Sequence, residues 1–231
     1  MQGVLLVDKP PGWTSFDVVN YVRKIVAQAS GKKPKNIKVG HTGTLDPFAT
    51  GLLVLVVGSD YTRRSRELSK LDKTYDVTMC LGQTSSTGDE EGQKRLISER
   101  VPTETEIRHV LSEFSGDIMQ RPPSFSAIKI NGQRAYRLAR AGKPMILEAR
   151  LVKIYENSLK TYSYPLAQFS SHVGSGTYIR SLVEDMGKKL KTGAYVSELC
   201  RLSVGNFYLE NALSVNNLSE DLITARLQSL D

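Results

Sequence analysis

Asp46 is the residue whose type and surroundings best suit chemistry in this sequence. It lies within residues 38–55, KVGHTGTLDPFATGLLVL, between a short apolar segment and a longer one. Pro47 fixes its own backbone and disfavours a helical conformation at Asp46, while the nearby glycines permit tight bends. Such a loop can hold a carboxylate rigidly at the floor of a cleft. Asp and Gly are also common in ordinary turns, so two interpretations stay open: a catalytic carboxylate or a turn residue.

His41 raises the alternative of Ser-His-Asp hydrolysis, because it precedes Asp46 by five residues. The sequence contains no G-x-S-x-G nucleophile elbow, and no Gly-Lys pair is followed by Ser or Thr as in a phosphate-binding loop. His109 falls in an amphipathic helical pattern and His172 in a strand pattern, so both are interpreted as structural. The sequence therefore disfavours a Ser-His-Asp hydrolase and a nucleotide-binding protein with a phosphate-binding loop.

The charge distribution favours a polyanionic partner. The 231 residues carry a formal net charge of +7, and residues 121–147 contain no Asp or Glu. Phe125 and Tyr136 lie among basic residues there, a composition suited to contacting phosphates and stacking on bases. The alternative is a solvated basic hairpin and helix. The basic residues of this segment are Arg121, Lys129, Arg134, Arg137, Arg140 and Lys143.

Composition also predicts the compartment. Cys80 and Cys200 lie far apart and lack zinc-ligand spacing, which is typical of a reducing environment and predicts no metal site. The longest apolar run, residues 52–57, is much shorter than the roughly 20 residues that a bilayer span needs. The apolar residues 4–7 are too few for a secretory signal. We therefore expect a cytoplasmic protein with no membrane association.

Hydrophobic spacing and capping signals predict strands interspersed with helices. Thr14 with Asp17, and Thr103 with Glu106, form capping boxes ahead of two helices, the first about 15 residues long. Residues 83–95 are expected to form a surface loop, and Asn131-Gly132 a hairpin turn. The result is a mixed, largely antiparallel α+β fold. Strands are expected at 4–7, 75–81, 124–130, 150–162 and 166–173, and further helices at 134–141, 178–191 and 219–230.

Five motifs in one order resemble the TruB family of tRNA pseudouridine synthases. Residues 40–53 match the family signature GHTGTLDPxATGxL almost residue for residue. Each other motif alone is a weak match, but their order over roughly residues 3–205 identifies the chain as a member. They are KPPGWTS at 9–15, DKTY at 72–75, GTYIRSL at 176–182, and GA at 193–194 followed by LCRL at 199–202.

This resemblance implies the pseudouridine synthase fold, with the catalytic cleft across a mixed sheet flanked by helices. Residues 120–148 are expected to form the family's thumb-like insertion within a single catalytic domain, 1–231. Family members commonly carry a C-terminal PUA domain that binds RNA. After residue 205 only enough sequence for a terminal helix remains before Asp231, so no PUA domain is expected here.

The resemblance also implies roles for individual residues. Asp46 becomes the catalytic aspartate that attacks or stabilises the sugar or base while the glycosidic bond breaks. Tyr75 stacks on the target uracil and serves in proton transfer, although a strand tyrosine is otherwise more often a core residue. Arg180 is the candidate cation for a carboxylate in a dry site, because its guanidinium stays charged; without its motif it would be read as a solvated residue at a helix start.

Substrate-binding residues follow from the same motifs. His41 holds the flipped nucleotide and Leu199 lines the uracil pocket, while Lys9 and Tyr178 support the cleft floor or are merely structural. The remaining predicted contacts to RNA are Gly43, Thr44, Arg134, Arg137 and Arg140. Isomerisation needs no redox step and no group donor, so the resemblance implies neither cofactor nor metal.

The resemblance implies a tRNA pseudouridine synthase that acts on uridine 55 in the T loop. The expected partner is the T-arm stem-loop of tRNA, bound by a monomer without an obligate protein partner. Three alternatives remain. One is a guide-RNA-dependent enzyme that modifies ribosomal RNA and needs protein partners. Another is a non-catalytic tRNA chaperone, against which the presence of Asp46, Tyr75 and Arg180 argues. The third is a plain RNA-binding module, which would not require a carboxylate beside the RNA.

Overall fold

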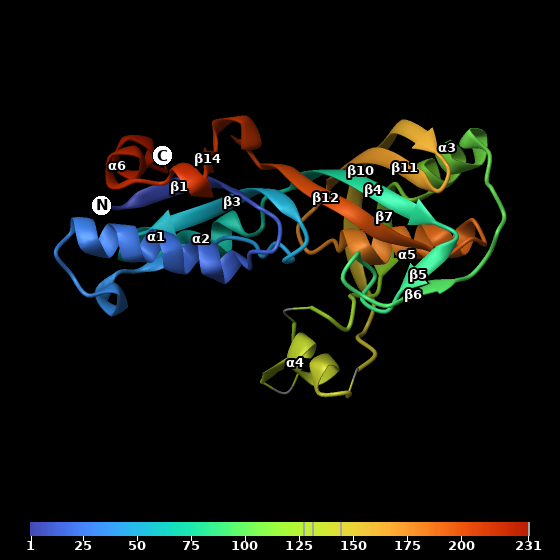
Figure 1. Cartoon of the computed structure of the whole chain (residues 1–231), viewed down its shortest axis with the longest axis horizontal. Coiled ribbons are helices and arrows are strands. Elements are labelled where there is room, and N and C mark those ends of the chain that lie inside the picture. The colour runs from blue at the N-terminus through green and yellow to red at the C-terminus, as the bar shows by residue number, and fades with distance from the viewer. Residues whose placement is uncertain (127, 131, 144, 231) are drawn as a thin grey trace. The chain divides into compact units, whose positions relative to one another are not determined.

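The computed structural model describes residues 1–126, 128–130, 132–143 and 145–230, with the backbone alone at 129, 130 and 140. The chain divides into two compact units (Figure 1). The first unit comprises Met1–Tyr75 and Leu199–Asp231, and the second comprises Asp76–Glu198. Both combine helices with mostly antiparallel strands, which confirms the predicted α+β class. Among the described residues, no helix is both long and apolar enough to span a membrane.

The first unit is built on the antiparallel pair β1 (Gly3–Lys9) and β3 (Thr50–Val57), aligned from Gly3 opposite Val57 to Lys9 opposite Gly51. Successive side chains of a strand point to opposite faces, and both faces are covered here. One face packs against α1 (Ser15–Ala29) and α6 (Glu220–Arg226), and the other against α2 (Ser59–Leu68). This explains why β3 is apolar along almost its whole length.

Apart from β12 (Ala194–Val204), which belongs to the first unit from Leu199 onward, the remaining elements of this unit are short. Strand β2 (Val39–His41) pairs with β3 in antiparallel fashion, β14 (Leu213–Ser214) pairs with β1 in parallel, and β13 (Phe207–Tyr208) pairs with the end of β12. Strand β12 also meets β3 in parallel, with Cys200 opposite Thr50 and Arg201 opposite Gly51. The 3-10 helices of this unit are η1 (Pro34–Asn36), η2 (Leu209–Asn211) and η3 (Val215–Asn217).

The second unit contains an antiparallel sheet in which β10 (Arg150–Ser163) lies between β7 (Gly116–Gln120) and β11 (Leu166–Val173). Helix α3 (Glu104–Glu113) begins after the predicted capping box of Thr103 and Glu106, and α5 (Ile179–Lys189) covers most of the predicted 178–191 segment. The other elements of this unit are β4 (Lys73–Leu81) from Asp76 onward, β5 (Gln83–Ser85), β6 (Lys94–Leu96), β8 (Lys129–Ile130), β9 (Gln133–Arg134) and α4 (Ala135–Arg140).

Three sequence predictions need correction. Among the described residues of the expected strand 124–130, only Lys129–Ile130 form a strand, because the carbonyls of Ser126 and Ile128 accept hydrogen bonds from the first residues of α4 instead of from a strand. The expected loop 83–95 contains the hairpin of β5 and β6. The terminal helix ends at Arg226, since Gln228 exchanges two backbone hydrogen bonds with Val4 of β1. Asn131 of the predicted turn lies outside the described residues.

Candidate functional site

A buried lysine, Lys9, anchors the backbone of the loop that carries Asp46. Lys9, at the end of β1, is fully buried, and its Nζ donates hydrogen bonds to the carbonyls of Pro10, Trp13 and Pro47 at 2.9, 2.8 and 3.1 Å. A buried ammonium is costly unless its donors are satisfied, and these carbonyls satisfy all three. Lys9 therefore ties the segment before α1 to the residue that follows Asp46.

Ser15 fixes the other neighbour of Asp46. Its hydroxyl accepts a hydrogen bond from the Leu45 backbone N–H at 2.8 Å and donates one to the Leu45 carbonyl at 3.1 Å. Ser15 is the first residue of α1, whose start is fixed by the capping box of Thr14 and Asp17. The position of the loop is thus coupled to the rigid start of a helix.

Arg201 fixes the segment upstream of Asp46. This arginine of β12 is buried, and its Nε donates to the Leu52 carbonyl at 2.8 Å while Nη2 donates to the Gly43 carbonyl at 3.0 Å. The close approach of β12 to β3 requires a glycine: a Cβ at Gly51 would lie 2.5 Å from the Arg201 carbonyl oxygen, and the φ of Gly51 is +96°. Arg201 was not among the predicted site residues, although it lies in one of the quoted motifs.

Most of the predicted site residues of the first unit lie in this loop or at its start. Asp46 is half-buried between the anchored residues Leu45 and Pro47, and His41 ends β2 at the start of the same loop. Thr44 is exposed and Gly43 is half-buried. Tyr75 and Leu199 are buried, and the Leu199 carbonyl lies 3.5 Å from the Thr50 hydroxyl of β3. The loop therefore presents a carboxylate whose backbone is fixed on both sides.

Lys73 is a second buried cation beside Arg201. Its Nζ donates hydrogen bonds to the carbonyls of Ser69 and Leu71. Burial, together with the positive charge of Arg201, lowers the pKa of Lys73 from 10.5 to about 8. At pH values between about 8 and 10.5, a lysine whose pKa is lowered in this way binds fewer protons in the folded state than in the unfolded state.

The free energy of unfolding should therefore contain a part that rises as the pH increases from about 8 to 10.5. Lys73→Met should lack this rise. Denaturant titrations of the wild type and the variant across this pH window measure the difference between them. Parallel pH profiles of the two proteins would contradict the lowered pKa.

Arg180 is the predicted catalytic residue of the second unit. This residue of the first turn of α5 is buried, and its Nη1 lies 3.3 Å from the Asp89 carboxylate. Nη1 also donates to the Thr87 carbonyl, and Nη2 to the Phe125 carbonyl, each at 2.8 Å. The guanidinium thus joins α5 to the loop between β5 and β6 and to Phe125, near the start of the basic residues 121–147. A solvated position for Arg180 is excluded.

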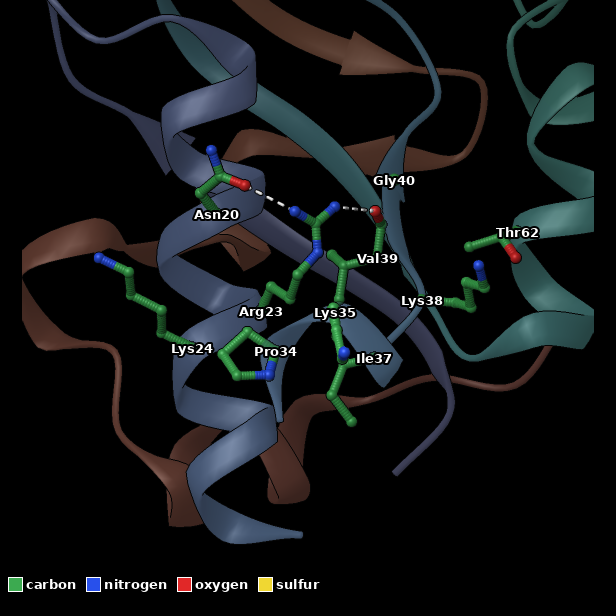
Figure 2. Close-up of a pocket in the computed structure, with 10 residues that line it drawn as sticks. All are labelled: Asn20, Arg23, Lys24, Pro34, Lys35, Ile37, Lys38, Val39, Gly40 and Thr62. Carbon is green, nitrogen blue, oxygen red and sulfur yellow. Dashed lines mark hydrogen bonds between the residues drawn. The ribbon is translucent and has the colours of Figure 1, made fainter. Parts of the chain in front are cut away.

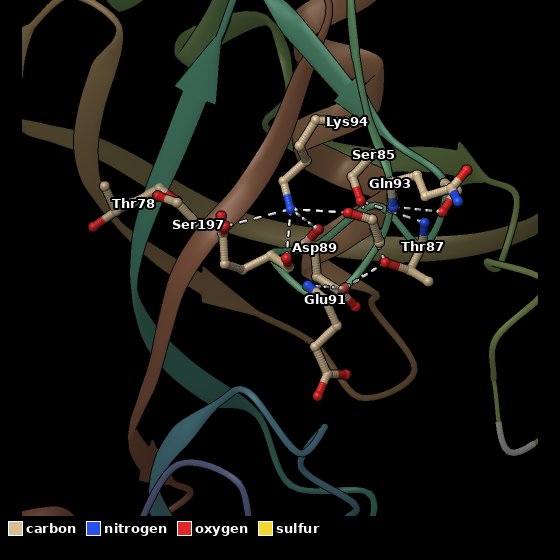
Figure 3. A network of polar contacts seen from close by, with 11 residues as sticks. Thr78, Ser85, Thr87, Asp89, Glu91, Gln93, Lys94 and Ser197 are labelled. Carbon is tan, nitrogen blue, oxygen red and sulfur yellow. Dashed lines mark hydrogen bonds and ion pairs between the residues drawn. The ribbon is translucent and has the colours of Figure 1, made fainter.

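Asp89 is the residue of this cluster that sequence reasoning missed, because it lies in the segment predicted to be a surface loop. It is buried, and its carboxylate accepts hydrogen bonds from the Thr87 hydroxyl and the Glu91 N–H. Lys94 closes the loop: its Nζ donates to the carbonyls of Asp89, Glu90 and Gly92 and lies 4.6 Å from the centre of the Tyr195 ring. Figure 3 shows Lys94, Asp89 and Thr87 within this network.

The other predicted site residues of the second unit are Tyr178 and the arginines of the α4 region. The side-chain amide of Gln120 forms two hydrogen bonds with the backbone of Tyr178, at 2.8 and 3.1 Å, and so fixes the start of α5. Arg134 and Arg137 are exposed at the start of α4 and within it. The side chain of Arg140 lies outside the described residues.

Among the described residues, no group of three or more His, Cys, Asp or Glu side chains could hold a metal ion.

Comparisons with known proteins agree with the sequence motifs. Residues 29–179 match the model of the TruB family pseudouridylate synthase N-terminal domain, and residues 180–230 match that of the tRNA pseudouridylate synthase B C-terminal domain. A tRNA pseudouridine synthase B of Protochlamydia amoebophila is 43% identical over 230 residues, covering 96% of this chain and 84% of the relative. One of Clostridium novyi is 42% identical over 231 residues, covering 100% and 77%.

Solved structures show the same fold. The chain aligns with a structure described as a Cbf5-Nop10-Gar1 complex with a TM-score of 0.71 and 32% identity, covering 95% of this chain and 54% of that one. It aligns with an H/ACA RNP bound to a substrate RNA containing 2'-deoxyuridine with a TM-score of 0.68 and 30% identity, covering 95% and 52%. The chain therefore spans about half of each of these solved chains. This likeness confirms the predicted pseudouridine synthase fold.

Proposed function

We propose that this chain, which belongs to the TruB family of pseudouridylate synthases, converts a uridine of the tRNA T loop, at conventional position 55, into pseudouridine. The relatives named tRNA pseudouridine synthase B support tRNA as the substrate. The observation that carries the proposal is the loop around Asp46. Lys9, Ser15 and Arg201 fix its backbone on both sides of a half-buried carboxylate.

The reaction needs what this loop can supply. The bond between N1 of uracil and C1' of the ribose breaks, the base turns, and a bond forms between C5 and C1'; C5 then loses a proton and N1 gains one. The target nucleotide must leave its stack, which costs a few kcal/mol. A carboxylate fixed in advance can attack or stabilise the reacting sugar or base without reorganising first.

We assign three residues to catalysis. Asp46 is the carboxylate that acts on the sugar or base. Tyr75 stacks on the uracil and takes part in proton transfer. Arg180 supplies the positive charge that an ionised carboxylate needs in a site without water. Its three contacts in the second unit, to Asp89, Thr87 and Phe125, keep the guanidinium in one orientation. The nucleotide is held by His41, Gly43, Thr44, Tyr178 and Leu199, and Lys9 supports the loop.

The basic insertion, residues 121–147, is assigned to the RNA backbone, with the exposed Arg134 and Arg137 as phosphate contacts. Replacing both by Gln should lower the slope of log K against log salt by about 0.7 to 0.9 for each lost phosphate contact. Binding titrations of a T-arm hairpin at several salt concentrations measure this slope.

Arg66 and Arg95, both exposed elsewhere in the chain, provide a matched control for the same loss of charge. A slope that changes equally in the two double variants would show that only net charge matters. In that case the insertion would not contact the phosphates.

Position mapping tests the proposal. The purified chain alone, with no protein or guide RNA added, should introduce pseudouridine into a whole tRNA transcript. After chemical modification of the pseudouridine, reverse transcription should stop at one position, 55. A transcript with cytidine at that position should show no stop. Modification elsewhere, or only when a guide RNA is added, would overturn the assignment to the T loop and favour the guide-dependent alternative. Light scattering of the active sample tests whether a monomer is sufficient.

A further inference from the structure

A hollow of about 570 Å³ opens in the first unit, beside α1 and the strand that leads into the Asp46 loop. Four of its lining residues are cations, and among its ten lining residues, all of them described, none is acidic. We name it the α1 pocket. Its lining includes Asn20, Arg23, Lys24, Lys35, Lys38 and Val39.

Arg23 is fixed in this pocket. Its Nη1 donates a hydrogen bond to the Asn20 side-chain oxygen at 2.6 Å, and Nη2 donates one to the Val39 carbonyl at 3.0 Å. A guanidinium carries five N–H donors, and these two bonds occupy two of them. Figure 2 shows the guanidinium between Asn20 and Val39, with Lys35 and Lys38 on the neighbouring segment and the Lys24 side chain pointing away from it. A fixed planar fork with lysines as additional point charges suits phosphate oxygens.

The number of charges favours a polymer over a single small anion. Lys24, Lys35 and Lys38 are all exposed. Lys32 and Lys33, which directly precede η1 in the sequence, are exposed as well and add to the basic surface. A single phosphate would not use five lysines and an arginine, whereas a nucleic-acid strand carries one phosphate per nucleotide. The acidic residues of the nearby helix α2 are already paired, Asp60 with Arg63 and Glu67 with Arg64.

An aromatic ring on the same face of α1 favours RNA as the polymer. Phe16 precedes Asn20 by four residues and Arg23 by seven, a spacing that puts the three on one side of a helix. Its side chain is 59% exposed, and the Arg23 guanidinium lies 5.8 Å from the centre of its ring. Exposed rings among cations are the surface on which unstacked bases are bound.

The α1 pocket is also connected to the Asp46 loop through two elements of the first unit. Val39 and Gly40 line the pocket, and the next residue of β2 is His41, where the loop begins. At the other end, the helix that carries Arg23 begins at Ser15, which holds Leu45. From these observations we propose that the α1 pocket binds backbone phosphates of the substrate RNA that lie outside the reacting nucleotide. This inference rests on the proposed function, which supplies the RNA.

The test is the triple variant Lys24→Gln, Lys35→Gln, Lys38→Gln, in which only exposed side chains change. We expect the dissociation constant for a T-arm hairpin to rise at least about tenfold at moderate salt, and the slope of log K against log salt to fall by about 0.7 to 0.9 per lost contact. The turnover rate at saturating RNA should stay within about twofold, because the pocket contacts no reacting atom.

The matched control removes three other exposed lysines, Lys153, Lys160 and Lys191, by the same substitution. It should keep the wild-type slope. If the two triple variants bind RNA alike, the inference is overturned, even if the wild type is fully active. If the wild type forms no pseudouridine but the pocket variant alone lowers the slope, the proposed function fails and the phosphate site stands.

Discussion

Replacing Asp46 by Asn is expected to abolish pseudouridine formation while RNA binding stays within a few fold of the wild type. The amide keeps the size of the side chain but has no negative charge and is a poor nucleophile. Loss of a covalent nucleophile costs far more than tenfold, and the basic surface supplies most of the affinity for RNA. Nucleoside analysis of the digested RNA measures the product, and hairpin titration measures binding.

The structure offers a control for this change. Asp60 is exposed and forms a surface ion pair with Arg63, so Asp60→Asn should change stability by less than about 1 kcal/mol and leave activity unchanged. Lys9, Ser15 and Arg201 hold the loop through backbone carbonyls and a backbone N–H, so the Asn variant should keep the loop in place. Residual turnover of Asp46→Asn above about 1% would remove Asp46 from the nucleophile role.

Arg180→Lys is expected to lower the turnover rate at least about 100-fold, the scale on which removing a pre-positioned donor acts, with little change in RNA affinity. Lysine keeps the charge but not the planar fork. The guanidinium reaches Asp89 and Thr87 through one nitrogen and Phe125 through the other, which a single ammonium cannot reproduce. Single-turnover kinetics with saturating enzyme separate this effect from binding.

Two further variants show whether a fall in the turnover rate of Arg180→Lys is specific to this arginine. Arg108→Lys changes an exposed arginine paired with Glu104 and should be silent. Asp89→Asn removes the buried carboxylate beside Arg180 and should also slow turnover, because the arginine loses the partner that orients it. Arg180→Lys with wild-type turnover would show that this arginine only joins three segments of the second unit.

Much of the fold could be predicted because local signals and tertiary packing agree. The capping box of Thr14 and Asp17 starts α1 at Ser15, and that of Thr103 and Glu106 starts α3. The apolar run of β3 is long because helices cover both faces of its sheet. Prediction failed where the partner of a segment is distant in the chain: Gln228 pairs with Val4, so the last helix ends early.

The same limit applies to the candidate site. The sequence motifs contained Asp46 and Arg180, but no local pattern indicates that Asp89, 91 residues before Arg180 in the chain, is its ion-pair partner. Arg201 was likewise missed, although it lies in a quoted motif, because residue type does not show that it holds the distant carbonyls of Gly43 and Leu52. Lys9, which also holds carbonyls, was found only because the resemblance gave it a supporting role.

Tritium release from a T-arm hairpin labelled at C5 of its uridines tests the central claim most directly, because binding alone cannot release the label. The wild-type chain should release one tritium for each hairpin that carries the target uridine, and none from a hairpin with cytidine at that position. Wild-type protein that saturates with the labelled hairpin and releases no tritium would contradict the assignment of this chain to uridine isomerisation in the T loop.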